Sequence, residues 1–199
     1  MTNKKYEQFG LKVFIIHGAY SNPNENWFPW LKNELEKLSI RVFVPKFPTP
    51  EKQDLNNWLK VFKKYIPYID EETIFVGHSL GPVFIMNILE NLDQPILAAF
   101  FVSGFTGLLG QPEFDEINKT ITNRKFYYSK IKNNCKKFFI YNSDTDPYVP
   151  LDKGCELARK LNGKLTIVKN GGHINASAGY TEFPLLLKDI KDFLRKYRL

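Results

Sequence analysis

The sequence predicts an α/β protein with a mostly parallel sheet of about six strands and helices on both faces. Short apolar runs rich in Val, Ile and Phe alternate with longer amphipathic segments, which is typical of buried strands joined by helical crossovers. The chain has 199 residues, a length that suits one domain with one core. We therefore expect a single domain over residues 1–199.

Six apolar runs are predicted as the strands, because each is short and dominated by β-branched and aromatic residues. In chain order they are residues 11–16, 42–44, 73–76, 96–102, 137–141 and 164–168. Right-handed crossovers between such strands place them parallel in one sheet.

Segments with apolar residues three and four apart are predicted as helices. They are residues 27–38, 55–66, 83–92, 153–161 and 183–197. No element is predicted for residues 104–122, which contain three glycines and Pro112. We expect this stretch to be a surface excursion, too short for a separate cap domain, and a candidate for the border of a pocket.

Composition indicates an ordinary globular protein, with 43% hydrophobic and 25% charged residues. Residues 1–12 lack the apolar stretch of a signal peptide or a membrane span, and Cys135 and Cys155 are too few for a disulfide scaffold. We expect a cytoplasmic protein without membrane association. The net charge of +7 comes from scattered lysines without an arginine-rich or aromatic RNA-binding motif, so we expect no nucleic-acid partner.

A nucleophile motif follows the third predicted strand directly. Gly77-His78-Ser79-Leu80-Gly81 matches G-x-S-x-G in the strand-to-helix context that this motif needs. The backbone reverses so sharply there that a Cβ at either glycine would clash, and the turn lifts the serine hydroxyl above the sheet edge. Ser79 is therefore the predicted nucleophile.

A serine hydroxyl needs a base, and the base needs a carboxylate to orient it. His173 lies in a glycine-rich loop after the sixth predicted strand, where the base is expected. The loop after the fifth strand offers Asp144 and Asp146. We favour Asp146, which opens an Asp-x-x-Val-Pro string, whereas Asp144 can hydrogen-bond the turn backbone. The chain order Ser79, Asp146, His173 is that of an α/β-hydrolase.

Backbone N–H groups are the expected donors to the oxyanion of an acyl-transfer reaction. The amide of Leu80, directly after the nucleophile, is the first predicted donor. The loop after the first strand, starting His17-Gly18, supplies the second through Ala19 or, as an alternative, Tyr20. The first and third strands should be neighbours where the strand order reverses, which would bring both loops together.

Several other residues invite a functional interpretation, and for each we favour a structural one. His17 and His78 are expected to hydrogen-bond backbone. Aromatic and apolar residues at the first helix and in the excursion are expected to be core residues, with a place at the pocket as the alternative; they are Trp27, Phe28, Trp30, Phe105, Leu108 and Leu109. No nucleotide-binding motif, metal-ligand cluster or cofactor lysine is evident, so no cofactor and no metal is expected.

The joint spacing of four segments resembles the small serine hydrolases of the retinoblastoma-binding-protein-nine type. The segments are His17-Gly18, Gly77-His78-Ser79-Leu80-Gly81, Asp146-Pro147-Tyr148-Val149-Pro150 and Gly172-His173. Asn26-Trp27-Phe28-Pro29-Trp30-Leu31 is similar to the bacterial branch. The resemblance implies a minimal α/β-hydrolase without a cap, the same three catalytic positions and small ester or amide substrates. The family was named for a retinoblastoma-binding partner recognised through a Leu-x-Cys-x-Glu string, which this chain lacks. After Gly81 this chain has Pro82, where the family usually has a small residue.

The predicted function is a serine hydrolase that cleaves small carboxylic esters or amides through an acyl-enzyme. The alternative is a catalytically weak protein of the same fold that acts through protein interaction, since a fold does not fix function. A third possibility, another reaction on this scaffold, would need a changed nucleophile or pocket, and a serine disfavours dehalogenation.

Overall fold

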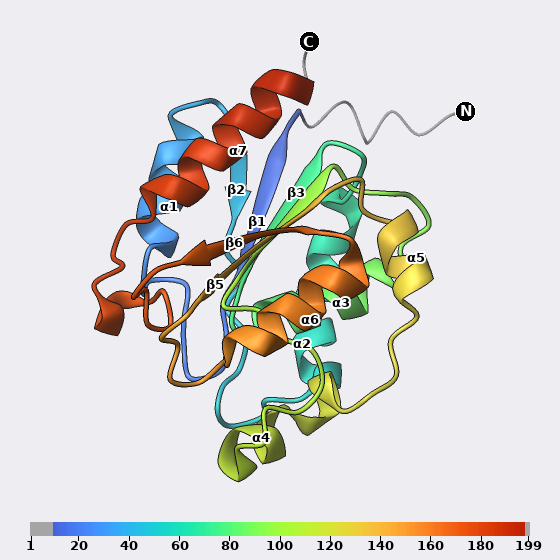
Figure 1. The fold of residues 1–199 in the computed structure, drawn as a ribbon. Coiled ribbons are helices and arrows are strands. Elements are labelled where there is room, and N and C mark those ends of the chain that lie inside the picture. The colour runs from blue at the N-terminus through green and yellow to red at the C-terminus, as the bar shows by residue number, and fades with distance from the viewer. Residues whose placement is uncertain (1–9, 198–199) are drawn as a thin grey trace.

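The computed structural model describes residues 10–197 and contains one six-stranded sheet (Figure 1). All neighbouring strands pair parallel, in the order β2-β1-β3-β4-β5-β6. The strands are β1 (Lys12–Ile16), β2 (Arg41–Phe43), β3 (Thr73–His78), β4 (Ala98–Val102), β5 (Phe138–Ser143) and β6 (Lys164–Val168). This sheet confirms the predicted fold class. Most of the polar segment 1–12, namely residues 1–9, lies outside the described residues.

Every predicted apolar run overlaps one of the strands, and no predicted end differs from the observed one by more than two residues. The fourth run was expected to start at residue 96, but Ile96 makes only an isolated parallel bridge with Cys135. The third strand continues past its predicted end to His78, so it leads straight into Ser79.

Helices cover both faces of the sheet (Figure 1). On one face are α1 (Phe28–Glu36) and α7 (Pro184–Tyr197). On the other are α2 (Leu55–Phe62) with the 3₁₀ turn η2 (Lys63–Tyr68), α3 (Gly81–Leu89), α5 (Tyr128–Asn133) and α6 (Leu151–Leu161). Alternate β1 residues enter the two cores, because side chains along a strand point to opposite faces.

The excursion between β4 and β5 is more regular than the sequence indicated. The prediction of no element there was wrong, because it contains α4 (Pro112–Thr122). Pro112 in the first turn and the acidic residues Glu113 and Asp115 are start signals for this helix. The prediction missed it because α4 is mostly polar and buries few of its residues, which weakens the apolar periodicity.

None of the helices in the described part of the chain is long and apolar enough to cross a membrane. The first and third strands are neighbours, as predicted, and the chain order reverses between them. The loops that follow β1 and β3 therefore meet at the carboxyl edge of the sheet, where open α/β sheets bind ligands.

Candidate active site

Ser79 lies in a strained turn between β3 and α3. Its φ is 57°, a left-handed conformation that non-glycine residues rarely adopt. A Cβ at Gly77 would lie 2.7 Å from the backbone nitrogen of Pro82, and one at Gly81 would lie 2.3 Å from the carbonyl oxygen of Ile16. The turn therefore has room only for glycine on both sides, as the motif predicted.

Pro82 stands in the first turn of α3. A helix has no intrahelical acceptor for the first N–H groups, so the missing N–H of a proline costs little there. The departure from the usual small residue is thus compatible with a regular helix behind Ser79.

His173 and Asp146 form a direct hydrogen-bonded pair. The Nδ1 atom of His173 lies 2.8 Å from Oδ2 and 3.0 Å from Oδ1 of Asp146. A carboxylate can only accept, so Nδ1 carries the proton, and in the neutral imidazole Nε2 keeps its lone pair. Burial opposes the charge of Asp146, but the imidazole of His173 and the N–H groups of Tyr148 and Val149 outweigh it and lower the pKa of the carboxyl.

Asp144 has a different task. Its Oδ1 accepts the backbone N–H of Asn170 at 2.8 Å, and its Oδ2 pairs with Lys169 at 2.9 Å. These contacts lower the pKa of the Asp144 carboxyl, with the lysine first. The aspartate fixes the turn that precedes the His173 loop, as expected for a loop aspartate.

Buried donors hold the backbone around His173. Its carbonyl oxygen lies 3.0 Å from Nε2 of His78 and 3.0 Å from Oγ of Ser103. The next carbonyl, that of Ile174, accepts Nε1–H of Trp27 at 3.0 Å. Ile174 has a φ of 48°, unusual for a β-branched residue, so these bonds fix a strained backbone beside the imidazole.

The two other histidines contact backbone, as predicted. His17 Nδ1 lies 2.8 Å from the carbonyl oxygen of Gly18, and its Nε2 accepts the amide of Phe47 at 3.0 Å. Burial lowers the pKa of His17. Burial and the neighbouring His173 lower the pKa of His78 to about 3, so His78 is neutral and donates through Nε2–H to the His173 carbonyl.

The loop after β1 approaches Ser79 closely. A Cβ on Gly18 would lie only 2.8 Å from the Cβ of Ser79, so a larger residue there would push the loops apart. The amide of Tyr20 already donates to Oγ1 of Thr49 at 2.7 Å. Within residues 10–197 the amides of Ala19 and Leu80 have no protein acceptor. Of the two alternatives for the second donor, Ala19 is therefore the available one.

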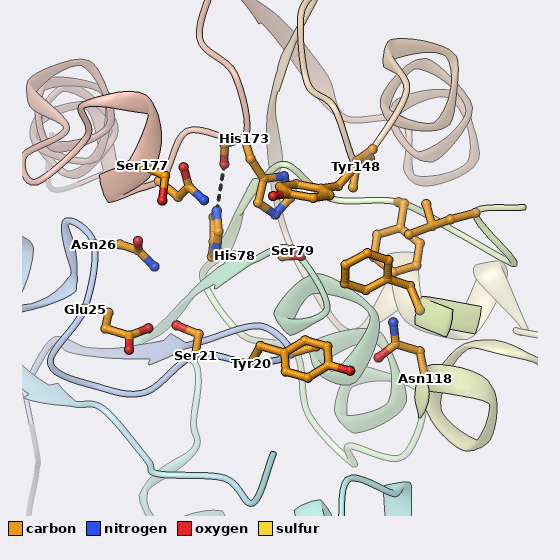
Figure 2. A pocket seen from close by; sticks show the side chains of 16 residues that line it. Tyr20, Ser21, Glu25, Asn26, His78, Ser79, Asn118, Tyr148, His173 and Ser177 are labelled. Atoms are coloured by element: carbon orange, nitrogen blue, oxygen red, sulfur yellow. Dashed lines mark hydrogen bonds between the residues drawn. The ribbon is translucent and has the colours of Figure 1, made fainter. Parts of the chain in front are cut away.

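A pocket of about 370 Å³ opens over Ser79 (Figure 2). Its lining includes Phe105 and Leu109 from the excursion, whereas Leu108 is exposed and does not line it. Trp27, Phe28 and Trp30 lie outside the lining; the first two are fully buried in the core, and Trp30 packs against it. The full lining is Ala19, Tyr20, Ser21, Glu25, Asn26, His78, Ser79, Phe105, Leu109, Phe114, Asn118, Tyr148, Val149, His173, Asn175 and Ser177.

Sequence reasoning missed many of these lining residues. Phe114 was missed because α4 was not predicted, although its position in the first turn of an amphipathic helix could have indicated it. Glu25, Asn175 and Ser177 carry no motif, and Asn26 was noted only as part of the segment that is similar to the bacterial branch. No group of three or more His, Cys, Asp or Glu side chains in the described ranges could hold a metal ion.

The sheet order and the turn at Ser79 define an α/β-hydrolase fold. The serine hydrolase family model matches residues 13–192, and the chain belongs to this family. The chain is 29% identical to the putative hydrolase YdeN of Bacillus subtilis, over 93% of this chain and 97% of that one. It is 28% identical to the serine hydrolase RBBP9 of Rattus norvegicus, over 92% and 95% respectively.

Solved structures agree with the fold. The crystal structure of the ydeN gene product from B. subtilis has a TM-score of 0.87 and covers 93% of this chain and 99% of that chain, at 29% identity. Est1E from Butyrivibrio proteoclasticus has a TM-score of 0.70 at 17% identity, over 94% and 88%, and shows the fold alone. The resemblance predicted from four short segments is confirmed, and the protein is a hydrolase of this family.

Proposed function

We propose that this hydrolase cleaves small carboxylic esters or amides through an acyl-enzyme, with Ser79 as nucleophile, His173 as base and Asp146 as the orienting acid. The observation that carries the proposal is the 2.8 Å contact between His173 Nδ1 and Asp146, beside a serine in a left-handed turn that lines the same pocket. The contact leaves Nε2 of His173 free to take a proton.

In the proposed first step, Ser79 Oγ attacks the substrate carbonyl carbon while His173 Nε2 takes its proton. The carbonyl π bond opens, and the amides of Leu80 and Ala19 stabilise the oxyanion. As the tetrahedral species collapses, the imidazolium gives its proton to the leaving oxygen or nitrogen. Asp146 stabilises the imidazolium, and its lowered pKa keeps it ionised during the cycle.

In the second step, water attacks the acyl-enzyme and His173 takes its proton. The second oxyanion collapses, the bond to Ser79 breaks, and the proton returns to Oγ as the carboxylic acid leaves. These steps use the chain's own groups. The single domain and the cytoplasmic location expected from the sequence remain part of the proposal.

The direct test compares the wild-type protein with Ser79→Ala, using p-nitrophenyl acetate and butyrate and an alkyl fluorophosphonate. We expect wild-type turnover and a mass increase of one phosphonyl group, with both absent from the variant. Loss of the nucleophile should lower kcat by roughly 10⁶-fold. A folded wild-type protein that neither hydrolyses these esters nor is labelled would contradict the proposal. It would favour the alternative, a catalytically weak protein of this fold that acts through protein interaction.

A further inference from the structure

The pocket over Ser79 has two chemically different walls. One wall is apolar and comes from the excursion, α4 and the loop after β5 that carries Asp146. It consists of Phe105, Leu109, Phe114, Tyr148 and Val149. The rings of Phe114 and Tyr148 lie 5.7 Å apart in an edge-to-face contact. A wall of this kind suits a short acyl chain, which would gain about 25 cal/mol for each Å² of buried apolar surface.

The other wall is polar. It is built from two distant segments, the loop after β1 and the segment after His173, and its side chains are Ser21, Glu25, Asn26, Asn175 and Ser177. Figure 2 shows Ser21, Glu25, Asn26 and Ser177 on one side of Ser79, and Asn118 on the other. We call Ser21, Glu25, Asn26, Asn175 and Ser177 the polar wall.

Two asparagines of the polar wall are fixed with their oxygens occupied. Asn26 Oδ1 accepts the backbone N–H of Ala176 at 2.9 Å, and Asn175 Oδ1 accepts that of Ala178 at 3.1 Å. Each side chain therefore retains its NH₂ group as the available donor. The first bond also ties the loop after β1 to the segment after His173, so the two halves of the wall are held together.

The acceptors of the polar wall are carboxylate and hydroxyl oxygens. Among residues 10–197, Glu25 is the only carboxylate that lines the pocket; it is exposed, and its Oε1 accepts a hydrogen bond from Asn22 Nδ2 at 2.5 Å. Ser177 contributes an exposed hydroxyl to the same wall. An alkyl group against this wall would displace water from these accessible groups without replacing its hydrogen bonds, at a cost of about 1–3 kcal/mol for each group that becomes buried.

We propose that the polar wall binds a hydroxylated alcohol, so that the preferred substrates are esters of a short acyl group with a polyol such as glycerol. A hydroxyl group both donates and accepts, which matches a wall that mixes amide donors with carboxylate and hydroxyl acceptors. A carboxylate there would be repelled by Glu25. This inference rests on the proposed function, because it names the substrate class of the same site.

The alcohol is assigned to the polar wall because of His173. The leaving oxygen must receive its proton from the imidazole, so the alcohol part has to lie next to His173. The His173 ring contacts Tyr148 of the apolar wall, with 5.0 Å between the ring centroids, whereas the chain after His173 continues into the polar wall, whose groups can bind hydroxyls. Asn175 and Ser177 follow His173 by two and four residues and lie on that segment. The acyl chain is then directed to the apolar wall formed with α4.

The test compares glycerol 1-butyrate with n-propyl butyrate, which has the same acyl group and the same three-carbon alcohol skeleton without the two hydroxyls. p-Nitrophenyl butyrate reports catalytic competence. We expect the wild-type kcat/KM for the glycerol ester to exceed that for the propyl ester by roughly tenfold or more, the value of one to two hydrogen bonds to a carboxylate or amide. Glu25→Ala and Ser177→Ala should each reduce this ratio about threefold or more.

A ratio within one variant cancels any general loss of activity, and Glu116→Ala on the exposed part of α4 is the matched control that should keep the wild-type ratio. Hydrolysis of p-nitrophenyl butyrate with equal rates for the glycerol and propyl esters would overturn the inference and leave the proposed function standing. A preference that persists in both pocket variants would also overturn the assignment to this wall. Absence of all ester turnover and of fluorophosphonate labelling would instead overturn the proposed function.

Discussion

At the scale of single residues, the site depends on backbone that is held in unfavourable conformations. Ser79 and Ile174 both have positive φ, and a left-handed conformation costs a residue with a side chain about 1–2 kcal/mol. Both are fixed by hydrogen bonds: Ser79 N–H donates to the carbonyl of Val102 at 2.9 Å, and the Ile174 carbonyl accepts from Trp27. The strain is therefore compensated by groups outside the three proposed catalytic residues.

His78 is the residue whose replacement tests this positioning. We expect His78→Leu, which removes the Nε2–H donor to the His173 carbonyl, to lower kcat by about 10²-fold, because an imidazole displaced by about 1 Å is a poor base. His78→Gln keeps an N–H donor and should recover part of kcat. Steady-state kinetics with p-nitrophenyl butyrate and thermal unfolding of both variants would measure this. Equal kcat in the two variants at matched stability would show that the hydrogen bond does not position the base.

What the sequence could predict at this scale depends on motif and order. Ser79, His173 and Asp146 were predicted because each stands after a strand in a fixed chain order. Ala19 stayed open against Tyr20, because only the contact from Tyr20 to Thr49 distinguishes them. The polar wall was not predictable, since two segments about 150 residues apart form it through bonds such as that of Asn26 to Ala176.

At the scale of elements, the turn before α4 shapes the apolar wall. The carboxylate of Asp115 accepts three backbone N–H groups, from Leu109 at 2.8 Å, Gly110 at 2.8 Å and Gln111 at 3.1 Å. It thus satisfies a turn that has two left-handed glycines, Gly107 and Gly110. Leu109 and the first turn of α4 line the pocket, so this carboxylate links a local turn to the substrate wall.

Asp115→Ala should therefore affect substrate binding more than chemistry. We expect the free energy of unfolding to fall by about 1–3 kcal/mol, because amide donors lose a charged acceptor, and KM for butyrate esters to rise several-fold. Asp115→Asn, with one accepting oxygen, should lie between. Urea unfolding and steady-state kinetics are the measurements, with Glu116→Ala as the control on the same helix. A variant with wild-type KM would show that the turn does not shape the wall.

The elements were predicted well where apolar periodicity is strong. All six strands are short and four of them, β1, β3, β4 and β5, are mostly buried, and α2, α6 and α7 have clear apolar faces, so pattern alone located them. The ends were less predictable: η2 continues α2 as a 3₁₀ helix with Pro67 inside it, which the periodicity up to residue 66 did not distinguish. The mostly polar α4 needed its capping signals to be weighed against weak periodicity.

At the scale of the whole molecule, the sheet separates two cores, and two neutral histidines are buried at its carboxyl edge. Burial is the largest cause that lowers the pKa of both His17 and His78, the latter to about 3. In the unfolded chain both would have pKa values near 6.5. The folded protein consequently binds fewer protons than the unfolded chain once the pH falls below about 6.5.

The free energy of unfolding should therefore fall as the pH is lowered below about 6.5. Each histidine that the unfolded chain protonates and the folded protein does not contributes about 1.4 kcal/mol of lost stability per pH unit. For His78 the loss begins near pH 6.5 and continues down to about pH 3, and His17 adds to it with the same sign. Urea unfolding between pH 8 and pH 4.5 should show a constant free energy of unfolding above pH 7 and a progressive decrease below 6.5.

His17→Asn, which retains a side-chain amide near the Gly18 and Phe47 backbone, should have a shallower decrease. A flat profile down to pH 4.5 would mean that both histidines take up protons in the folded state, in conflict with their burial.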